Sequence, residues 1–353
     1  MVDSLEKEIS RTLIQNSEVP EVVRKSLDNT YDIIKKKQKS NDIWNKSMKR
    51  IAVAACGILI VGALAANGAV IAGVKTFFND QGIVRIFEEG LFQTNYSYIT
   101  DENISVSLDS YFYDSNKISL IMNVKFDDVN ALKSIENVGL DFRLKNGNGE
   151  YIAEMIPDTK PLKGEVLPHV VNAAEMRNSI DINKGEVQFY IILESTKGAI
   201  PILSNAVLDV ESVNLFDKSG QLTKIDGTWP LTINEIIDVT IPTIEYIAQN
   251  NSSDIEVLSA KASPSSFNIN YALNGNYELL SMKLISEKGE EFEGRGFYLE
   301  EKNGKTFITT NFAVSSYDHV SKYILQVYKI GSFQNDGSIK YLLTDQAVDL
   351  VKK

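Results

Sequence analysis

Residues 51–74 read IAVAACGILIVGALAANGAVIAGV, a run of 24 residues without a charged side chain. As an α-helix this run would be about 36 Å long, enough to cross a hydrocarbon core of roughly 30 Å. A buried core helix is usually shorter or shows a polar stripe, whereas here Asn67 is the only strongly polar residue. The run therefore predicts one transmembrane helix over residues 51–74.

The charges beside this run predict its orientation. Residues 35–50 carry seven Lys or Arg side chains against the single acid Asp42. Since Lys and Arg are enriched on the cytoplasmic side of a membrane span, we expect a single-pass protein of the cell membrane with a cytoplasmic N-terminus and an extracellular C-terminus. The alternative is a cleaved signal peptide, with Ala63-Leu64-Ala65 as a possible cleavage site. The roughly 50 residues that precede the apolar run favour an uncleaved anchor.

Composition excludes several classes of protein. Of 353 residues, 36 are Lys or Arg and 47 are Asp or Glu, which gives a formal charge of −11 and disfavours a nucleic acid as a direct partner. The single cysteine excludes an intramolecular disulfide and a multi-cysteine zinc site.

Residues 1–50 predict a cytoplasmic helical segment with a net charge of +3. Apolar residues recur every three or four positions in two pieces, as in amphipathic helices. Two short helices cannot bury much surface against each other, so these apolar faces need membrane lipid or a protein groove, unless the segment is simply a solvated tail. The residues expected to bind a partner are Leu5, Ile9, Leu13, Val19, Val23, Leu27 and Ile34.

The sequence beyond residue 100 has patterns typical of a β-protein. Ile104, Val106 and Leu108 alternate with serines, and residues 117–126 (KISLIMNVKF) read as a more buried strand. Asn-Gly pairs at Asn146-Gly147 and Asn303-Gly304 predict hairpin turns. The expected fold class is mostly β outside the membrane, with two Ig-like β-sandwich domains. The predicted segments are a juxtamembrane bridge over 75–100, a first β-domain over 101–240 and a C-terminal β-sandwich over 241–353.

The bridge and the scattered polar residues leave some alternatives open. Apolar side chains between residues 77 and 92 predict a short amphipathic helix that lies either on the membrane or on the first β-domain. His169 and His319 have no nucleophile-elbow motif to support catalysis. Trp229 is expected to pack in a core. No residue is assigned to catalysis, to a cofactor or to a metal, and we expect the chain not to be an enzyme.

Several motifs resemble those of one family. Residues 19–30 (VPEVVRKSLDNT) are followed by a lysine run and the apolar segment, residues 103–108 (NISVSL) lead into 113–120 (YDSNKISL), and Gly227-Thr228-Trp229 forms a GxW motif. This order resembles the DUF4179 family, whose members are regarded as membrane-bound, anti-sigma-like negative effectors of extracytoplasmic-function sigma factors in Gram-positive bacteria. Residues 255–257 with Ser263-Pro264 are similar to a companion C-terminal β-domain.

The resemblance implies a function in signal transduction and transcription regulation. Residues 1–50 would sequester an extracytoplasmic-function sigma factor without any metal, and the outer β-domains would sense an envelope signal. Two alternatives remain at this point. One is a membrane-anchored extracellular module for ligand binding or adhesion, and the other is an extracellular hydrolase that uses paired carboxylates.

Overall fold

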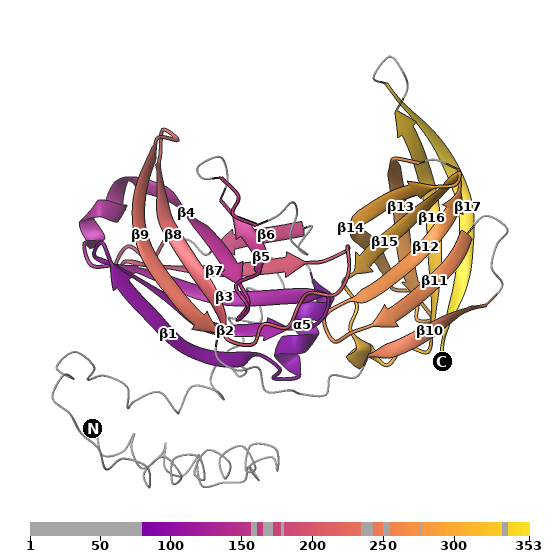
Figure 1. Cartoon of the computed structure of the whole chain (residues 1–353), viewed down its shortest axis with the longest axis horizontal. Helices are drawn as coiled ribbons and strands as arrows, with labels where there is room; N and C mark the ends of the chain where they lie inside the picture. Colours follow the sequence, from indigo (N-terminus) through magenta and orange to yellow (C-terminus); the bar gives the residue numbers. More distant parts are fainter. Residues whose placement is uncertain are drawn as a thin grey trace, which may run out of the picture. The chain divides into compact units, whose positions relative to one another are not determined.

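The computed structural model describes most of the chain beyond residue 79, and all of the described residues belong to one structural unit, Gly57–Lys353 (Figure 1). The described residues are 80–156, 161–164, 172–177, 180–233, 243–249, 255–275, 277–333 and 338–353.

The first β-domain consists of two antiparallel sheets. One sheet has five strands in the order β1-β2-β3-β7-β6, and the other has four in the order β5-β4-β8-β9. Its strands are β1 (Gln93–Asp101), β2 (Ile104–Tyr113), β3 (Lys117–Phe126), β4 (Ile135–Lys145), β5 (Tyr151–Met155), β6 (Asn172–Arg177), β7 (Glu186–Glu194), β8 (Ala206–Asp217) and β9 (Leu222–Ile233), with a 3-10 helix, η1 (Val129–Ser134), before β4.

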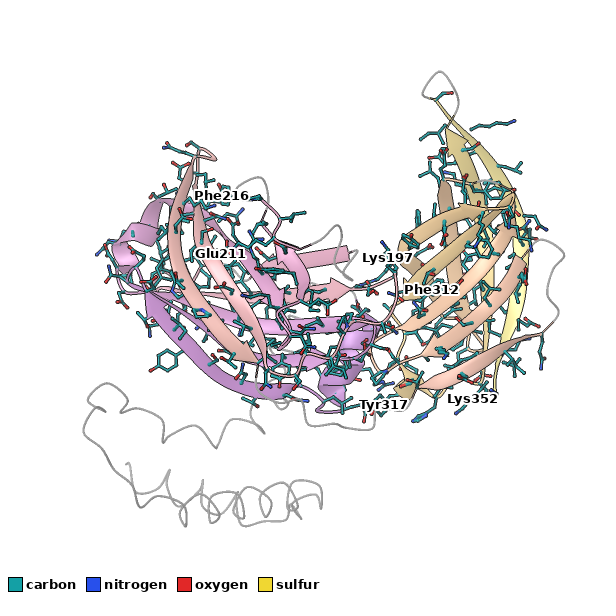
Figure 2. The ribbon with its side chains drawn as sticks, in the orientation of Figure 1. Lys197, Glu211, Phe216, Phe312, Tyr317 and Lys352 are labelled. Carbon is teal, nitrogen blue, oxygen red and sulfur yellow. The ribbon has the colours of Figure 1, made fainter. Side chains whose placement is uncertain are left out.

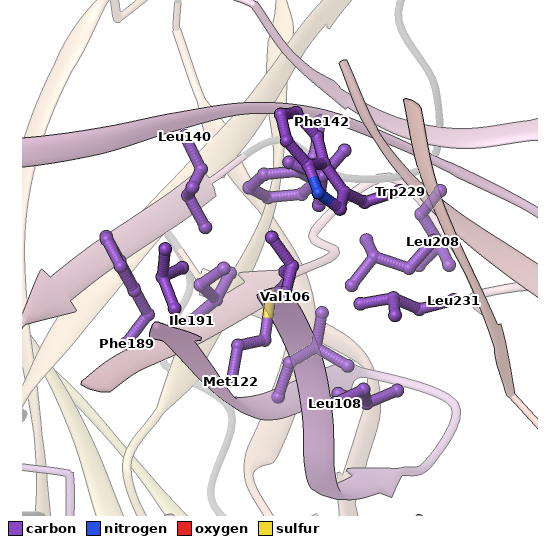
Figure 3. Packing of buried hydrophobic residues seen from close by; sticks show 14 of the residues in the cluster. Val106, Leu108, Met122, Leu140, Phe142, Phe189, Ile191, Leu208, Trp229 and Leu231 are labelled. Carbon is purple, nitrogen blue, oxygen red and sulfur yellow. The ribbon is translucent and has the colours of Figure 1, made fainter. Parts of the chain in front are cut away.

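The inner faces of the two sheets share one hydrophobic core (Figure 3). Val106 and Met122 come from the five-stranded sheet, and Phe142, Leu208 and Trp229 come from the four-stranded sheet. These residues sit on alternate positions of their strands, because successive side chains of a strand point to opposite faces. The alternation of apolar and polar residues along β2 is therefore the direct cause of its buried inner face.

A short helix, α5 (Gln81–Glu88), covers part of the outer face of the five-stranded sheet. Ile83 and Ile86 are fully buried there and pack with Phe112, Ile121 and Tyr190 of the sheet. This contact explains why β3 is apolar on both faces, since one face meets the second sheet and the other meets the helix. Of the two surfaces expected for the bridge helix, the structure shows the first β-domain.

The C-terminal β-domain is a closed barrel with the strand order β10-β11-β12-β15-β14-β13-β16-β17. Its core is a separate hydrophobic cluster that contains the aromatic group Tyr246, Phe267 and Tyr323, with ring centroids 4.9–5.5 Å apart. The strands are β10 (Ile244–Gln249), β11 (Ile255–Ala262), β12 (Phe267–Asn274), β13 (Leu279–Ser286), β14 (Glu291–Lys302), β15 (Lys305–Phe312), β16 (Lys322–Phe333) and β17 (Ile339–Lys352), with a 3-10 helix, η2 (Ser316–Asp318), before β16.

The expected fold class needs two corrections. The C-terminal domain is a closed barrel and not an Ig-like sandwich, because β10 pairs with β11 on one side and with β17 on the other. The second correction concerns the predicted transmembrane helix: in the part of the chain that the structure describes, no helix is long and apolar enough to cross a membrane. The predicted span over residues 51–74 and the cytoplasmic helices of residues 1–50 lie outside the described residues. The single-pass topology and the cell-membrane localisation built on that span are therefore not carried further.

Both predicted hairpin turns are present. β4 and β5 pair on either side of residues 146–150, and β14 and β15 pair across Asn303 and Gly304. Asn303 has φ 53° and Gly304 has φ 73°. Positive φ at both central residues is what a two-residue type I′ hairpin requires, which is why Asn-Gly is favoured there.

Candidate functional site

A polar cavity of about 390 Å³ lies on the outer face of the four-stranded sheet. Its volume falls within the range of roughly 300–1,000 Å³ that is usual for small-molecule sites. Leu140, Phe142 and Leu144 of β4 point into the core, so the residues between them are on the opposite face. The lining residues are Arg143, Pro161, Lys163, Asp209, Glu211, Gly227 and Thr228.

Arg143 is the central side chain of the cavity wall, and only 1% of it is exposed. Its Nε donates a hydrogen bond of 2.8 Å to Glu211 Oε1 on β8, and its Nη2 donates one of 3.0 Å to the carbonyl of Pro161. Its Nη1 forms an ion pair with Glu154 on β5. A guanidinium with several donors in a fixed plane suits such a three-partner contact.

The segment 161–164 lies against this wall through the same carboxylates. The backbone amides of Lys163 and Gly164 donate to Glu154, at 3.0 Å and 2.6 Å for the shortest contacts. The Lys163 ammonium donates to Glu211 Oε1 at 2.9 Å. Figure 2 labels Glu211 on β8, where this contact is made. The buried arginine therefore holds both the strands and the segment that borders the cavity.

Asp209 differs from the other charged residues of the cavity. It is partly buried on β8, two residues before Glu211, and no described residue forms a hydrogen bond or an ion pair with it. Among the residues that the structure describes at the cavity, two are cations, Arg143 and Lys163, and three are carboxylates, Glu154, Asp209 and Glu211. Asp209 is the carboxylate that neither cation pairs with. The cavity therefore favours a ligand that carries a cationic group.

The cavity lies next to the core of the first β-domain. Gly227 and Thr228 line it, and the next residue, Trp229, is fully buried. The indole ring lies so close beneath Gly227 that a β-carbon at this position would overlap it. The GxW motif therefore has a structural reason: a glycine lets the tryptophan ring fill the space next to the cavity floor.

A second cluster of charges is buried where α5, the first β-domain and the barrel meet. Asp80 is the N-cap of α5, and its Oδ2 accepts hydrogen bonds from Lys117 Nζ on β3 at 2.7 Å and from Arg295 Nη1 on β14 at 3.0 Å. Lys117 Nζ also donates to the Ser265 carbonyl at 3.1 Å and lies 3.5 Å from Glu194 Oε1. The side chains of Asp80 and Lys117 are fully buried.

The charge on Glu194 is the least well compensated in this second cluster. Desolvation is the main cause that raises its pKa above the ordinary value of 4.5, and Asp80 raises the pKa further. Lys117 and Arg295 act in the opposite direction. Lys117 lies closer to Asp80 than to Glu194, so desolvation of the Glu194 carboxylate dominates.

Glu194→Gln is expected to make stability less dependent on pH. Because the folded-state pKa of Glu194 is raised, its contribution to stability is fully present below pH 4.5 and is lost as the pH rises through the raised value. The variant should match the wild type near pH 4 and exceed it in urea midpoint near pH 7. Glu186→Gln, at the partly exposed start of β7, is the control. A Glu194→Gln protein that loses stability relative to the wild type on going from pH 4 to pH 7 would contradict the assignment.

The residues named from sequence fall mostly outside these sites. Leu5, Ile9, Leu13, Val19, Val23, Leu27, Ile34 and His169 lie outside the described residues. His319 is exposed and ends η2 with φ 50°. Within the described ranges, no three His, Cys, Asp or Glu side chains gather as a metal site would require.

The cavity residues were not recognised from the sequence. The available signal was a charged residue at every second position of two strands whose other positions are apolar, as in Asp141 and Arg143 of β4 and in Asp209 and Glu211 of β8. Such alternation usually marks a solvated face, and nothing local to either strand says that these side chains become buried together.

The fold and the cavity define a two-domain β-protein with a charged pocket on its first domain. No protein-family model matches the chain, and neither does any curated protein. The resemblance to the DUF4179 family therefore has no support from these comparisons. Among solved structures, the chain is similar to a conserved domain protein from Bacillus anthracis, with 11% identity over 73% of this chain and 91% of that chain and a TM-score of 0.45.

Proposed function

We propose that the described part of the chain is a recognition module without enzymatic activity, and that the cavity beside Arg143 binds a small polar ligand that carries a cationic group. The observation that carries this proposal is the partly buried Asp209 carboxylate, which lines the cavity without a partner among the described residues. A buried or half-buried charge is normally paired, and an ammonium or guanidinium group of a ligand would pair it.

The other lining groups support the same class of ligand. The Arg143 guanidinium is already bonded to two carboxylates and a carbonyl, so it shapes the wall and is not available as the main contact for an anion. Thr228 is exposed at the rim and offers a hydroxyl group, while its backbone amide donates to Asp101 at 2.9 Å. Fixed walls, one unpaired carboxylate and a hydroxyl suit a small ligand with an amine and further polar groups.

The expected result with Asp209→Asn is a loss of cation binding. L-arginine, L-lysine and spermidine should raise the melting temperature of the wild-type protein and bind in calorimetric titrations, whereas L-glutamate and glucose should not. The substitution should weaken binding of the cationic probes by about tenfold to a hundredfold, because a charge-assisted hydrogen bond contributes roughly 1.5–3 kcal/mol.

Asp127→Asn is the matched control, since Asp127 is an exposed aspartate of the first β-domain outside the cavity. It should bind the probes as the wild type does. Equal weakening in both variants would indicate nonspecific attraction to an acidic protein and would reject the pocket. Binding by none of the cationic probes would also count against the proposed ligand class.

Docking of a sigma factor on residues 1–50 stays a prediction from the sequence. The described residues offer no observation that favours it over a ligand-binding module, so it is not proposed as a second function.

A further inference from the structure

The Asp80 carboxylate accepts hydrogen bonds from three parts of the structure. Its Oδ1 accepts a hydrogen bond of 3.1 Å from the Ile83 amide and so caps α5. Its Oδ2 accepts from Lys117 of the first β-domain and from Arg295 of the barrel. A helix, a sheet and a barrel are thus tied to the same buried side chain.

A second carboxylate reinforces this joint between the domains. Asp114 follows β2, and its Oδ1 accepts the backbone amides of Asn116 and Lys117 in its own turn. Its Oδ2 accepts from the barrel, at 2.8 Å from Ser263 Oγ and 2.5 Å from Ser265 Oγ. The barrel loop around Ser263 and Ser265 is therefore held by charged groups of the first β-domain.

Close packing leaves little room for adjustment at this joint. A β-carbon on Gly82 of α5 would overlap the carbonyl oxygen of Ser265, the same oxygen that accepts from Lys117. Ser265 is fully buried, and Asn311 of the barrel, also fully buried, donates to the Ser195 carbonyl at 2.8 Å. The hydrophobic cores of the two domains are separate clusters, so polar contacts make up much of what holds the domains together here.

We propose that α5 is a latch, in which the Asp80 carboxylate holds the barrel on the first β-domain and releases it when the start of the helix is displaced. Buried ion pairs are suited to this use, because removing one member leaves the other buried with less counter-charge. Lys117 would keep the more distant Glu194 carboxylate, 3.5 Å away, as a counter-charge. Displacing Asp80 would leave both Lys117 and Arg295 without their shared partner in one step. Because its two oxygens serve α5, the first β-domain and the barrel, loss of the Asp80 carboxylate weakens all three contacts together, while the Asp114 contacts remain.

Asp80→Asn tests the latch without removing the helix cap. Asparagine is a good N-cap residue, and its side-chain oxygen can still accept from Ile83, so α5 keeps its start while the negative charge is lost. In the full chain we expect calorimetry to show the barrel and the first β-domain melting as two separate transitions where the wild type melts them as one. The Ser265 amide, which donates to Asp114 Oδ2, should exchange its hydrogen at least about tenfold faster.

Arg295→Gln and the double variant Asp80→Asn/Arg295→Gln give a second measurement. If both residues act in one latch, the double variant should show little further increase in Ser265 exchange over Asp80→Asn. Asp349→Asn removes the carboxylate of a partly exposed ion pair with Lys322 inside the barrel and should leave the melting pattern and Ser265 exchange unchanged. Unchanged melting and exchange in Asp80→Asn, or the same splitting in Asp349→Asn, would overturn the latch. None of these variants alters a residue of the cavity, so the result is independent of ligand binding.

Discussion

Trp229→Ala is expected to lower the free energy of unfolding of the first β-domain by about 3–5 kcal/mol, the usual cost of removing a large aromatic side chain from a core. Trp229 is fully buried between the two sheets (Figure 3). Its Nε1 donates a hydrogen bond of 2.9 Å to the carbonyl of Ile104. The substitution would leave both a cavity and a buried carbonyl without its donor. Urea denaturation followed by circular dichroism would measure the change.

Two further variants make this result specific to the core position. Trp229→Phe keeps much of the ring volume and loses the indole donor, so it should cost less than the alanine variant. Leu222→Ala removes an apolar side chain from the same strand, β9, at a residue that is 43% exposed, and should change the free energy of unfolding by less than about 1 kcal/mol. A Trp229→Ala protein as stable as the Leu222→Ala protein would refute the packing described for the core.

Arg143→Met should cost a similar amount, about 3–5 kcal/mol, for an electrostatic reason. The Glu154 side chain is 1% exposed and that of Glu211 is 11% exposed. Removal of the guanidinium leaves these carboxylates buried without their main counter-charge, which is far more costly than the loss of a surface ion pair. Thermal melting and urea denaturation at pH 7 would both show the loss.

A triple variant distinguishes the cost of burying unpaired carboxylates from a general loss of stability. Arg143→Met combined with Glu154→Gln and Glu211→Gln removes the whole set of charges and should recover much of the stability. Lys163→Met removes an ammonium that is 52% exposed, and an exposed ion pair contributes only about 0–1 kcal/mol. If Lys163→Met cost as much as Arg143→Met, or if the triple variant recovered nothing, the arginine would not be the centre of this network.

Much of the strand structure could be predicted from local patterns. The alternation at Ile104, Val106 and Leu108 predicted β2, the apolar run over residues 117–126 predicted β3, and Asn303-Gly304 predicted the hairpin between β14 and β15. The burial of Trp229 was also predicted correctly. These features depend on side-chain period and on turn geometry, which act over a few residues.

Other elements could not be predicted from their local sequence. β1, with the sequence QTNYSYITD, falls almost entirely within the predicted juxtamembrane bridge over residues 75–100 and was not predicted as a strand. It lies at the edge of the five-stranded sheet, where polar side chains are tolerated on both faces. The prediction of a second sandwich was wrong because barrel closure depends on the pairing of β10 with β17, whose partners Tyr246 and Lys352 are far apart in sequence.

The charged sites were decided by tertiary structure alone. Lys117 opens an ordinary apolar strand, and nothing within that strand indicates that its ammonium is fully buried against Asp80 and near Glu194. Arg143 and Asp209 likewise occupy positions that would suit a solvated sheet face. By itself, the amino-acid sequence determined strands with a clear side-chain pattern, such as β2 and β3, and the two Asn-Gly turns, since these features rest on interactions between near neighbours. Which charges are buried, which are paired and which carboxylate stays open to a ligand depended on contacts between distant segments, because burial and counter-charge exist only once those segments have packed together.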